Sequence, residues 1–193
     1  AAPRWNRDAI GSPPVAPGKY EVVLHVGGHS YSRPATVMQD AHAPWTVSDA
    51  TASRETVVDI VSRMSAVDDM LNALDALDAK LDARSKVAIS NAKLSGMIAA
   101  VRRGASAVRA ELTSSPTNDQ DDDFLPDMLR ERLQALYFQL SGSQYAPATA
   151  ALRELDDLGR MQADASSRYR ALMDGDVASL DAALKAAGYL PVH

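Results

Sequence analysis

The side chains that could bind a metal or move a proton are four histidines and many carboxylates. The histidines are His25, His29, His42 and His193. A zinc site or an acid–base pair needs such side chains to converge. A chain reversal at Gly27-Gly28 would place His25 and His29 on opposite faces of a hairpin, because side chains along a strand alternate between faces. We therefore expect ordinary exposed histidines and no shared metal site.

The carboxylates form two groups. Asp75, Asp78 and Asp82 share one helical face by their spacing, and the helical period places Asp68 on the polar side of the same helix. Di-metal sites in helical bundles combine inward Glu residues with Glu-x-x-His pairs, and no predicted helix here contains a His, so we interpret this face as solvated. The acidic run from Asp119 to Asp123 lacks the central Gly and the distal Glu of an EF-hand calcium loop. We expect a charged connector there and leave calcium binding open.

No nucleophile or phosphate-binding motif accompanies these groups. The chain has no Cys, which excludes thiol chemistry and disulfides, and it has no Gly-x-Ser-x-Gly elbow or Gly-rich phosphate loop. A net charge of -5 leaves no basic surface for nucleic acid. No apolar run reaches the roughly 20 residues of a membrane span. We predict no catalytic, cofactor-binding or metal-ligating residue, and therefore no enzyme in this chain by itself.

Alternating apolar side chains predict a β-hairpin within residues 1–45. The alternating positions are Tyr20, Val22, Leu24 and Val26 in the first strand, and Tyr31, Arg33, Ala35 and Val37 in the second. Gly27-Gly28 suits a two-residue turn with positive φ values. Pro34 cannot donate to a ladder, so the second strand lies at an edge or is broken there. An isolated hairpin is marginal in water, and we expect Trp5 to cover one end of its apolar face.

From about Thr51 the apolar period changes to the three-four spacing of helices. The predicted helices cover about residues 51–81, 94–112, 126–140 and 147–172, with a short final segment ending at Gly188. Ser53 or Asp49 could cap the first helix, residues 84–91 form either a loop or a kink, and residues 174–176 mark a turn or sharp kink. We predict a mainly α fold, an antiparallel bundle of about four helices over residues 46–193, preceded by the hairpin region.

Several stretches carry a resemblance to one family. They are Trp5-Asn6-Arg7, Pro17-Gly18-Lys19-Tyr20-Glu21-Val22-Val23-Leu24, Ser30-Tyr31-Ser32-Arg33-Pro34-Ala35-Thr36-Val37, and the C-terminal stretch from Asp176 to Pro191. Together with the long first helix and the helix from Pro126 to Leu140, they resemble the C-terminal region of bacterial BNR/Asp-box, VPS10/sortilin-like β-propeller proteins, where the end of an immunoglobulin-like (Ig-like) domain leads into a helical tail. The resemblance implies that earlier strands of an Ig-like sheet are missing here. It confers no catalytic residue, and the Asp-box motif itself is absent from the sequence.

The resemblance also implies a setting. Ala1-Ala2-Pro3 lacks an initiator Met and a signal-peptide core, so we expect the chain to begin inside a longer gene product or at a processed terminus. Our leading hypothesis is a non-catalytic C-terminal accessory module that stabilises or oligomerises a secreted or periplasmic glycosyl-hydrolase-like propeller protein. Its partners would be the upstream domains or a second copy. The alternatives are part of a glycosidase- or peptidase-related enzyme with its active site upstream, or a helical module that binds a peptide or glycan.

Overall fold

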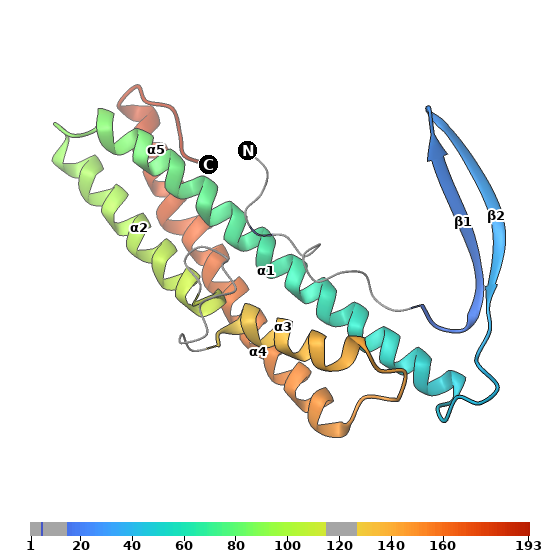
Figure 1. Cartoon of the computed structure of the whole chain (residues 1–193). Coiled ribbons are helices and arrows are strands. Elements are labelled where there is room, and N and C mark those ends of the chain that lie inside the picture. The colour runs from blue at the N-terminus through green and yellow to red at the C-terminus, as the bar shows by residue number, and fades with distance from the viewer. Residues whose placement is uncertain (1–4, 6–14, 115–126) are drawn as a thin grey trace.

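The computed structural model describes Trp5, residues 15–114 and residues 127–193. These residues form a mainly helical structure with a two-stranded hairpin, so the predicted fold class is confirmed (Figure 1). The strands are β1 (Gly18–Val26) and β2 (His29–Val37). The helices are α1 (Val47–Val87), α2 (Ala92–Leu112), α3 (Leu129–Ser141), α4 (Thr149–Leu172), the π-helical turn η2 (Met173–Val177) and α5 (Ala178–Ala186).

Helix α1 is the longest helix of the bundle. Its 41 residues give a length of about 60 Å at the usual rise per residue. Helices α2 and α3 follow one another along α1, and α4 runs with η2 and α5 beside both of them (Figure 1). One core therefore lies between three units: α1, the successive helices α2 and α3, and the continuous segment of α4, η2 and α5.

The start of α1 lies a turn before the predicted one. Thr46 is the N-cap, its hydroxyl accepting from the Asp49 N–H, while the Asp49 carboxylate accepts from the Thr46 N–H at 2.8 Å. This reciprocal pair is a capping box. The prediction of Ser53 or Asp49 as the cap was therefore wrong, since Asp49 is the third helical residue and Ser53 lies buried inside the helix. The Ser53 hydroxyl donates to the Ser143 carbonyl oxygen at 2.7 Å instead, which links α1 to the loop that follows α3.

Two junctions between helices differ in kind. Between α1 and α2 the chain makes a loop, because α2 has its own N-cap, Asn91, whose side chain accepts from the Leu94 N–H at 3.1 Å. Residues 174–176, predicted as a turn or sharp kink, lie instead within η2, so α4 continues into α5 as one rod. The buried Val177 holds this segment against the core. Gly188, with a φ of 80°, then ends the rod as predicted.

The predicted helical seams make the core. The apolar positions predicted for α1 and α2 are all buried: Val57, Ile60, Met64, Val67, Leu71, Leu74, Leu77, Leu81, Leu94, Ile98, Val101, Ala105, Val108 and Leu112. The three-four spacing also predicts Leu152 of α4 as a core position, and this prediction was wrong, since Leu152 is 43% exposed. Its neighbour Ala151 is only 6% exposed, because the buried face of α4 runs through Ala151, Leu155 and Leu158 and Leu152 lies beside that face.

The hairpin stands apart from the helices, beside the start of α1 (Figure 1). Gly27 and Gly28 take positive φ values of 57° and 79°, as a type I′ turn requires. The register pairs Val26 with His29 and continues without a bulge to Gly18 with Val37. Strand β2 is not broken at Pro34, so of the two alternatives for this strand the edge position is correct.

Candidate functional site

One face of the hairpin is apolar and faces solvent. The cross-strand pairs on this face include Val22 with Arg33, Leu24 with Tyr31 and Val26 with His29. We call the following side chains the apolar hairpin face: Tyr20, Val22, Leu24, Val26, Tyr31, Ala35 and Val37. Val22, Leu24, Val26 and Tyr31 are each between 56% and 59% exposed. The hairpin thus presents a mainly apolar surface, with Arg33 and His29 as its polar members, that the described residues leave exposed.

The opposite face is mostly polar. Across it, the Ser32 hydroxyl donates to the Glu21 carboxylate, and His25 Nδ1 lies 2.7 Å from the Ser30 hydroxyl. Val23 is the exception, an apolar side chain 46% exposed among these polar groups. His25 pairs with Ser30 and His29 with Val26, so the two histidines lie on opposite faces, as predicted.

Among the described residues the hairpin is a two-stranded sheet, and its two outer edges differ in the N–H groups they offer. In a two-residue hairpin the closing pair, here Val26 and His29, exchanges both backbone hydrogen bonds, and bonded and non-bonded pairs then alternate. Pro34 pairs with Glu21, which is a non-bonded position. The missing N–H of Pro34 therefore leaves the ladder intact and removes a donor from the outer edge of β2.

Trp5 connects the residues before the hairpin to the middle of α1. Its N–H donates to Asn72 Oδ1 at 3.0 Å, and the Asn72 amide donates back to the Trp5 carbonyl at 2.9 Å. The indole Nε1–H donates to Asp75 Oδ2 at 3.1 Å. The prediction that Trp5 covers the end of the hairpin was wrong: the ring is only 2% exposed, but it is buried on the bundle, where polar partners match its backbone and its indole.

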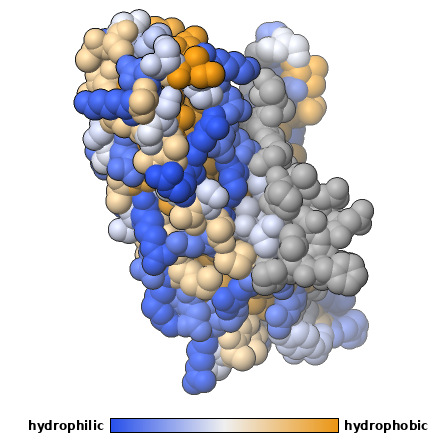
Figure 2. Space-filling view, turned by 90° about the vertical axis from the view of Figure 1, so that its left-hand side faces the viewer, coloured by the Kyte–Doolittle hydropathy of each residue, from blue (hydrophilic) through white to orange (hydrophobic). Residues whose placement is uncertain are grey.

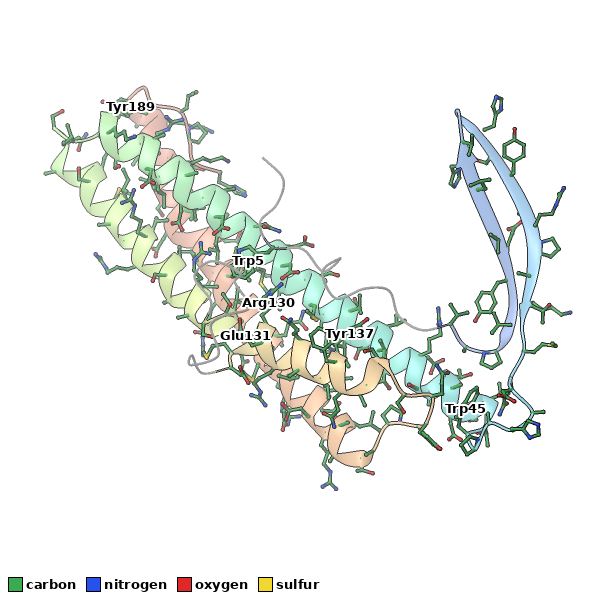
Figure 3. The ribbon with its side chains drawn as sticks, viewed as in Figure 1. Trp5, Trp45, Arg130, Glu131, Tyr137 and Tyr189 are labelled. Atoms are coloured by element: carbon green, nitrogen blue, oxygen red, sulfur yellow. The ribbon has the colours of Figure 1, made fainter. Side chains whose placement is uncertain are left out.

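A buried ion pair lies next to this indole. Arg130 Nε donates to Asp68 Oδ1 at 2.7 Å, and the Arg130 guanidinium carbon lies 5.0 Å from the centre of the Trp5 ring. Figure 3 shows Trp5 and Arg130 meeting at the centre of the bundle. Burial raises the pKa of the Asp68 carboxyl, although Arg130 opposes this shift. Asp68 Oδ2 has no hydrogen-bond partner among the described residues.

Sequence reasoning missed this pair. The helical period placed Asp68 on the polar side of α1, whereas its side chain is 5% exposed and its partner Arg130 is 6% exposed. The pair joins α1 to α3 and supports the indole of Trp5, so we assign it a structural role. To predict this pair from the sequence, one would need to know that Asp68 and Arg130 both point into the core from separate helices, and that depends on how the helices pack.

The acidic face of α1 is paired with α2. Arg109 donates to Asp75 at 2.7 Å and to Asp78 at 2.9 Å, and Arg102 forms an ion pair with Asp82. The face is partly solvent-accessible, as expected, but these three carboxylates orient α2 on α1 rather than standing as a free acidic surface.

The remaining candidate groups do not converge. The backbone N–H of His42 donates to the Asp40 carboxylate, and that of His193 donates to the Asp181 carboxylate. Within residues 15–114 and 127–193, no three His, Asp or Glu side chains are arranged to hold a metal ion. The run from Asp119 to Asp123 lies outside the described residues.

The face of the molecule shown in Figure 2 is mostly hydrophilic, with apolar atoms gathered near its top. The exposed apolar residues at the α1–α2 turn and the C-terminal segment are Val87, Ile89 and Leu190. None of the helices in the described part of the chain is both long enough and apolar enough to cross a membrane.

Comparisons with known proteins add no relative. The sequence matches no known protein family, and neither the curated proteins nor the solved structures contain a match.

Proposed function

We propose that this chain is a non-catalytic accessory module that attaches its helical bundle to a β-sheet domain through the hairpin. The observation that carries the proposal is the exposure of the apolar hairpin face beside a bundle that already has its own core. Ile60, Leu74 and Leu158 in that core are 0% exposed, whereas Leu24 of the hairpin is 58% exposed.

The energetics favour a partner for the hairpin. Burying an exposed Val or Leu side chain fully stabilises a structure by about 1.5–3 kcal/mol. A two-stranded hairpin is marginal in water, and three or more strands with a covered face make a stable sheet. The hairpin therefore has the composition of part of a larger sheet, and the described part of the chain contributes no third strand to it.

The resemblance noted in the sequence suggests where the rest of the sheet lies. In the β-propeller proteins that this chain resembles, a similar strand pair ends an Ig-like domain ahead of a helical tail. We propose that the partner is the upstream part of the same secreted or periplasmic protein, and that any catalytic activity of that protein is located there. The bundle would then stabilise or oligomerise the parent.

A pair of matched substitutions tests this proposal. Leu24→Asp changes the apolar hairpin face, and Leu152→Asp changes an exposed position of α4. In the 193-residue chain alone, both variants should change the free energy of unfolding by no more than about 0.5 kcal/mol. In the full product of the gene, Leu24→Asp should destabilise the sheet domain by about 2–4 kcal/mol, because a carboxylate is then buried.

The measurement is the midpoint of thermal unfolding of each variant in both forms of the protein. Equal, small effects of Leu24→Asp and Leu152→Asp in the full gene product would contradict the proposal. So would a full gene product that contains no β-sheet domain for the hairpin to join.

A further inference from the structure

We infer that an extended strand from the partner sheet pairs with the outer edge of β1, and that β2 remains the outermost strand. This inference rests on the proposed function and identifies which of the two free edges is the docking edge. It follows from the register of the hairpin and the position of one proline.

Strand β2 has the features of an edge strand. By the alternation set at the turn, the outward backbone groups of β2 belong to Ser30, Ser32, Pro34 and Thr36. Pro34 has no N–H, so a strand added there would face a missing donor in the middle of the ladder. Prolines at such positions are a common protection of free edges against pairing.

Strand β1 has the features of an interior strand. Its outward backbone groups belong to Lys19, Glu21, Val23 and His25, and each of these residues can both donate and accept. The run Val22-Val23-Leu24 places apolar side chains on both faces of the sheet, as strands buried on both sides do. The edge of β1 lacks the proline that interrupts the edge of β2.

The same partner must also cover the apolar hairpin face. Pairing of two copies of this chain through β1 would extend the sheet but leave Leu24 and Tyr31 of each copy in solvent. A β-sandwich domain supplies both requirements, since one of its sheets continues the ladder from β1 and the other packs on the apolar face about 10 Å away. We therefore commit to a strand of a β-sandwich as the occupant.

Residue-resolved amide hydrogen exchange of the full gene product tests the inference, with the 193-residue chain as the reference. The outward amides of Glu21, Val23 and His25 should exchange at least about 100-fold more slowly in the full gene product than in the chain alone. Those of Ser30, Ser32 and Thr36 should exchange at similar rates in both.

Two proline variants provide an independent readout. Val23 and Ser32 face each other at a non-bonded pair, so Val23→Pro removes a donor from the edge of β1 and Ser32→Pro removes one from the edge of β2. In the full gene product, Val23→Pro should abolish the slow exchange of the Glu21 and His25 amides, and Ser32→Pro should preserve it.

Slow exchange on the β2 edge, or fast exchange on both edges, would overturn the inference. If Leu24→Asp nevertheless destabilises the full gene product, the proposed function stands and only the choice of edge fails. If Leu24→Asp has no effect there, the proposed function itself fails.

Discussion

Glu21 lies directly opposite Pro34 in the hairpin, at a pair whose backbone nitrogens point away from the ladder. Because of this position, Pro34 removes no hydrogen bond from the hairpin itself. It does remove an N–H donor that a strand added beside β2 would need. The position of Pro34 also explains why β2 continues through this residue without a bulge. The hairpin is therefore an asymmetric element, with one edge able to accept a strand and one edge interrupted.

The Trp5 anchor should contribute strongly to stability. Trp5→Ala removes a buried aromatic ring and should reduce the free energy of unfolding by about 3–5 kcal/mol. Trp5→Phe keeps a ring under Arg130 but removes the Nε1–H donor to Asp75. Its reduction in the free energy of unfolding should exceed the reduction expected from the smaller buried ring by only about 1 kcal/mol. Urea unfolding of the 193-residue chain measures both. An unchanged transition in Trp5→Ala would show that the anchor is not formed in solution.

The capping box at the start of α1 gives a second prediction. Thr46→Ala removes the hydroxyl that accepts from the Asp49 N–H and should lower the free energy of unfolding by about 1 kcal/mol. Thr51→Ala is the control, because the Thr51 hydroxyl donates only to the Val47 carbonyl, which is already part of the helix. That control should be neutral or slightly stabilising, as Ala is the better helix former. Equal losses in the two variants would contradict Thr46 as the cap.

Two glycines of α2 should respond differently to alanine. A Cβ at Gly104 would lie 2.7 Å from Leu172 Cδ1, whereas a Cβ at Gly96 would meet nothing within 4 Å. Gly96→Ala should therefore stabilise the chain by about 0.5–1 kcal/mol through helix propensity. Gly104→Ala should be at least about 1 kcal/mol less stable than Gly96→Ala, because Leu172 must move. Thermal and urea unfolding of the two variants check this, and equal gains would show that α2 and α4 pack less closely than described.

The buried ion pair predicts a pH dependence. Because burial raises the pKa of Asp68, the folded chain binds this proton more readily than the unfolded chain. The contribution of Asp68 to stability is therefore fully present below its unfolded pKa and is lost as pH rises through the folded value. Asp68→Asn removes the titration while keeping the side-chain size.

The quantity to measure is the free energy of unfolding of the wild type minus that of Asp68→Asn. This difference should increase as the pH falls from 7 toward 4, and other carboxylates cancel in it. A difference that decreases over this range would mean that Arg130 outweighs burial and holds the pKa of Asp68 below its ordinary value.

The sequence was sufficient for the elements whose pattern is local. The alternation around Gly27-Gly28 predicted the strands and the turn, and the three-four spacing predicted the helices and most of their buried positions, but not Met70, Asp68 or Arg130. The N-cap of α1 was predicted wrongly because several polar residues near Thr46 are suitable caps. The segment now in η2 was predicted as a turn because its Asp-Gly-Asp run is typical of turns, whereas the packing of Val177 keeps it helical.

The long-range contacts could not be predicted in the same way. Trp5 meets Asn72 and Asp75 across 67 and 70 residues, and Arg130 meets Asp68 across 62. No periodicity connects positions so far apart. The candidate interaction surface was partly predictable, since its apolar alternation is visible in the sequence, but its exposure depends on where the bundle lies relative to the hairpin.

The central claim is that a partner domain covers the apolar hairpin face, and two tyrosines with similar exposure allow a direct test. Tyr31 of the hairpin is 59% exposed and Tyr145, between α3 and α4, is 54% exposed. Hydroxyl-radical labelling should modify both in the 193-residue chain. In the full product of the gene, labelling of Tyr31 should fall to background while that of Tyr145 is retained; equal labelling of both tyrosines in that protein would contradict the account.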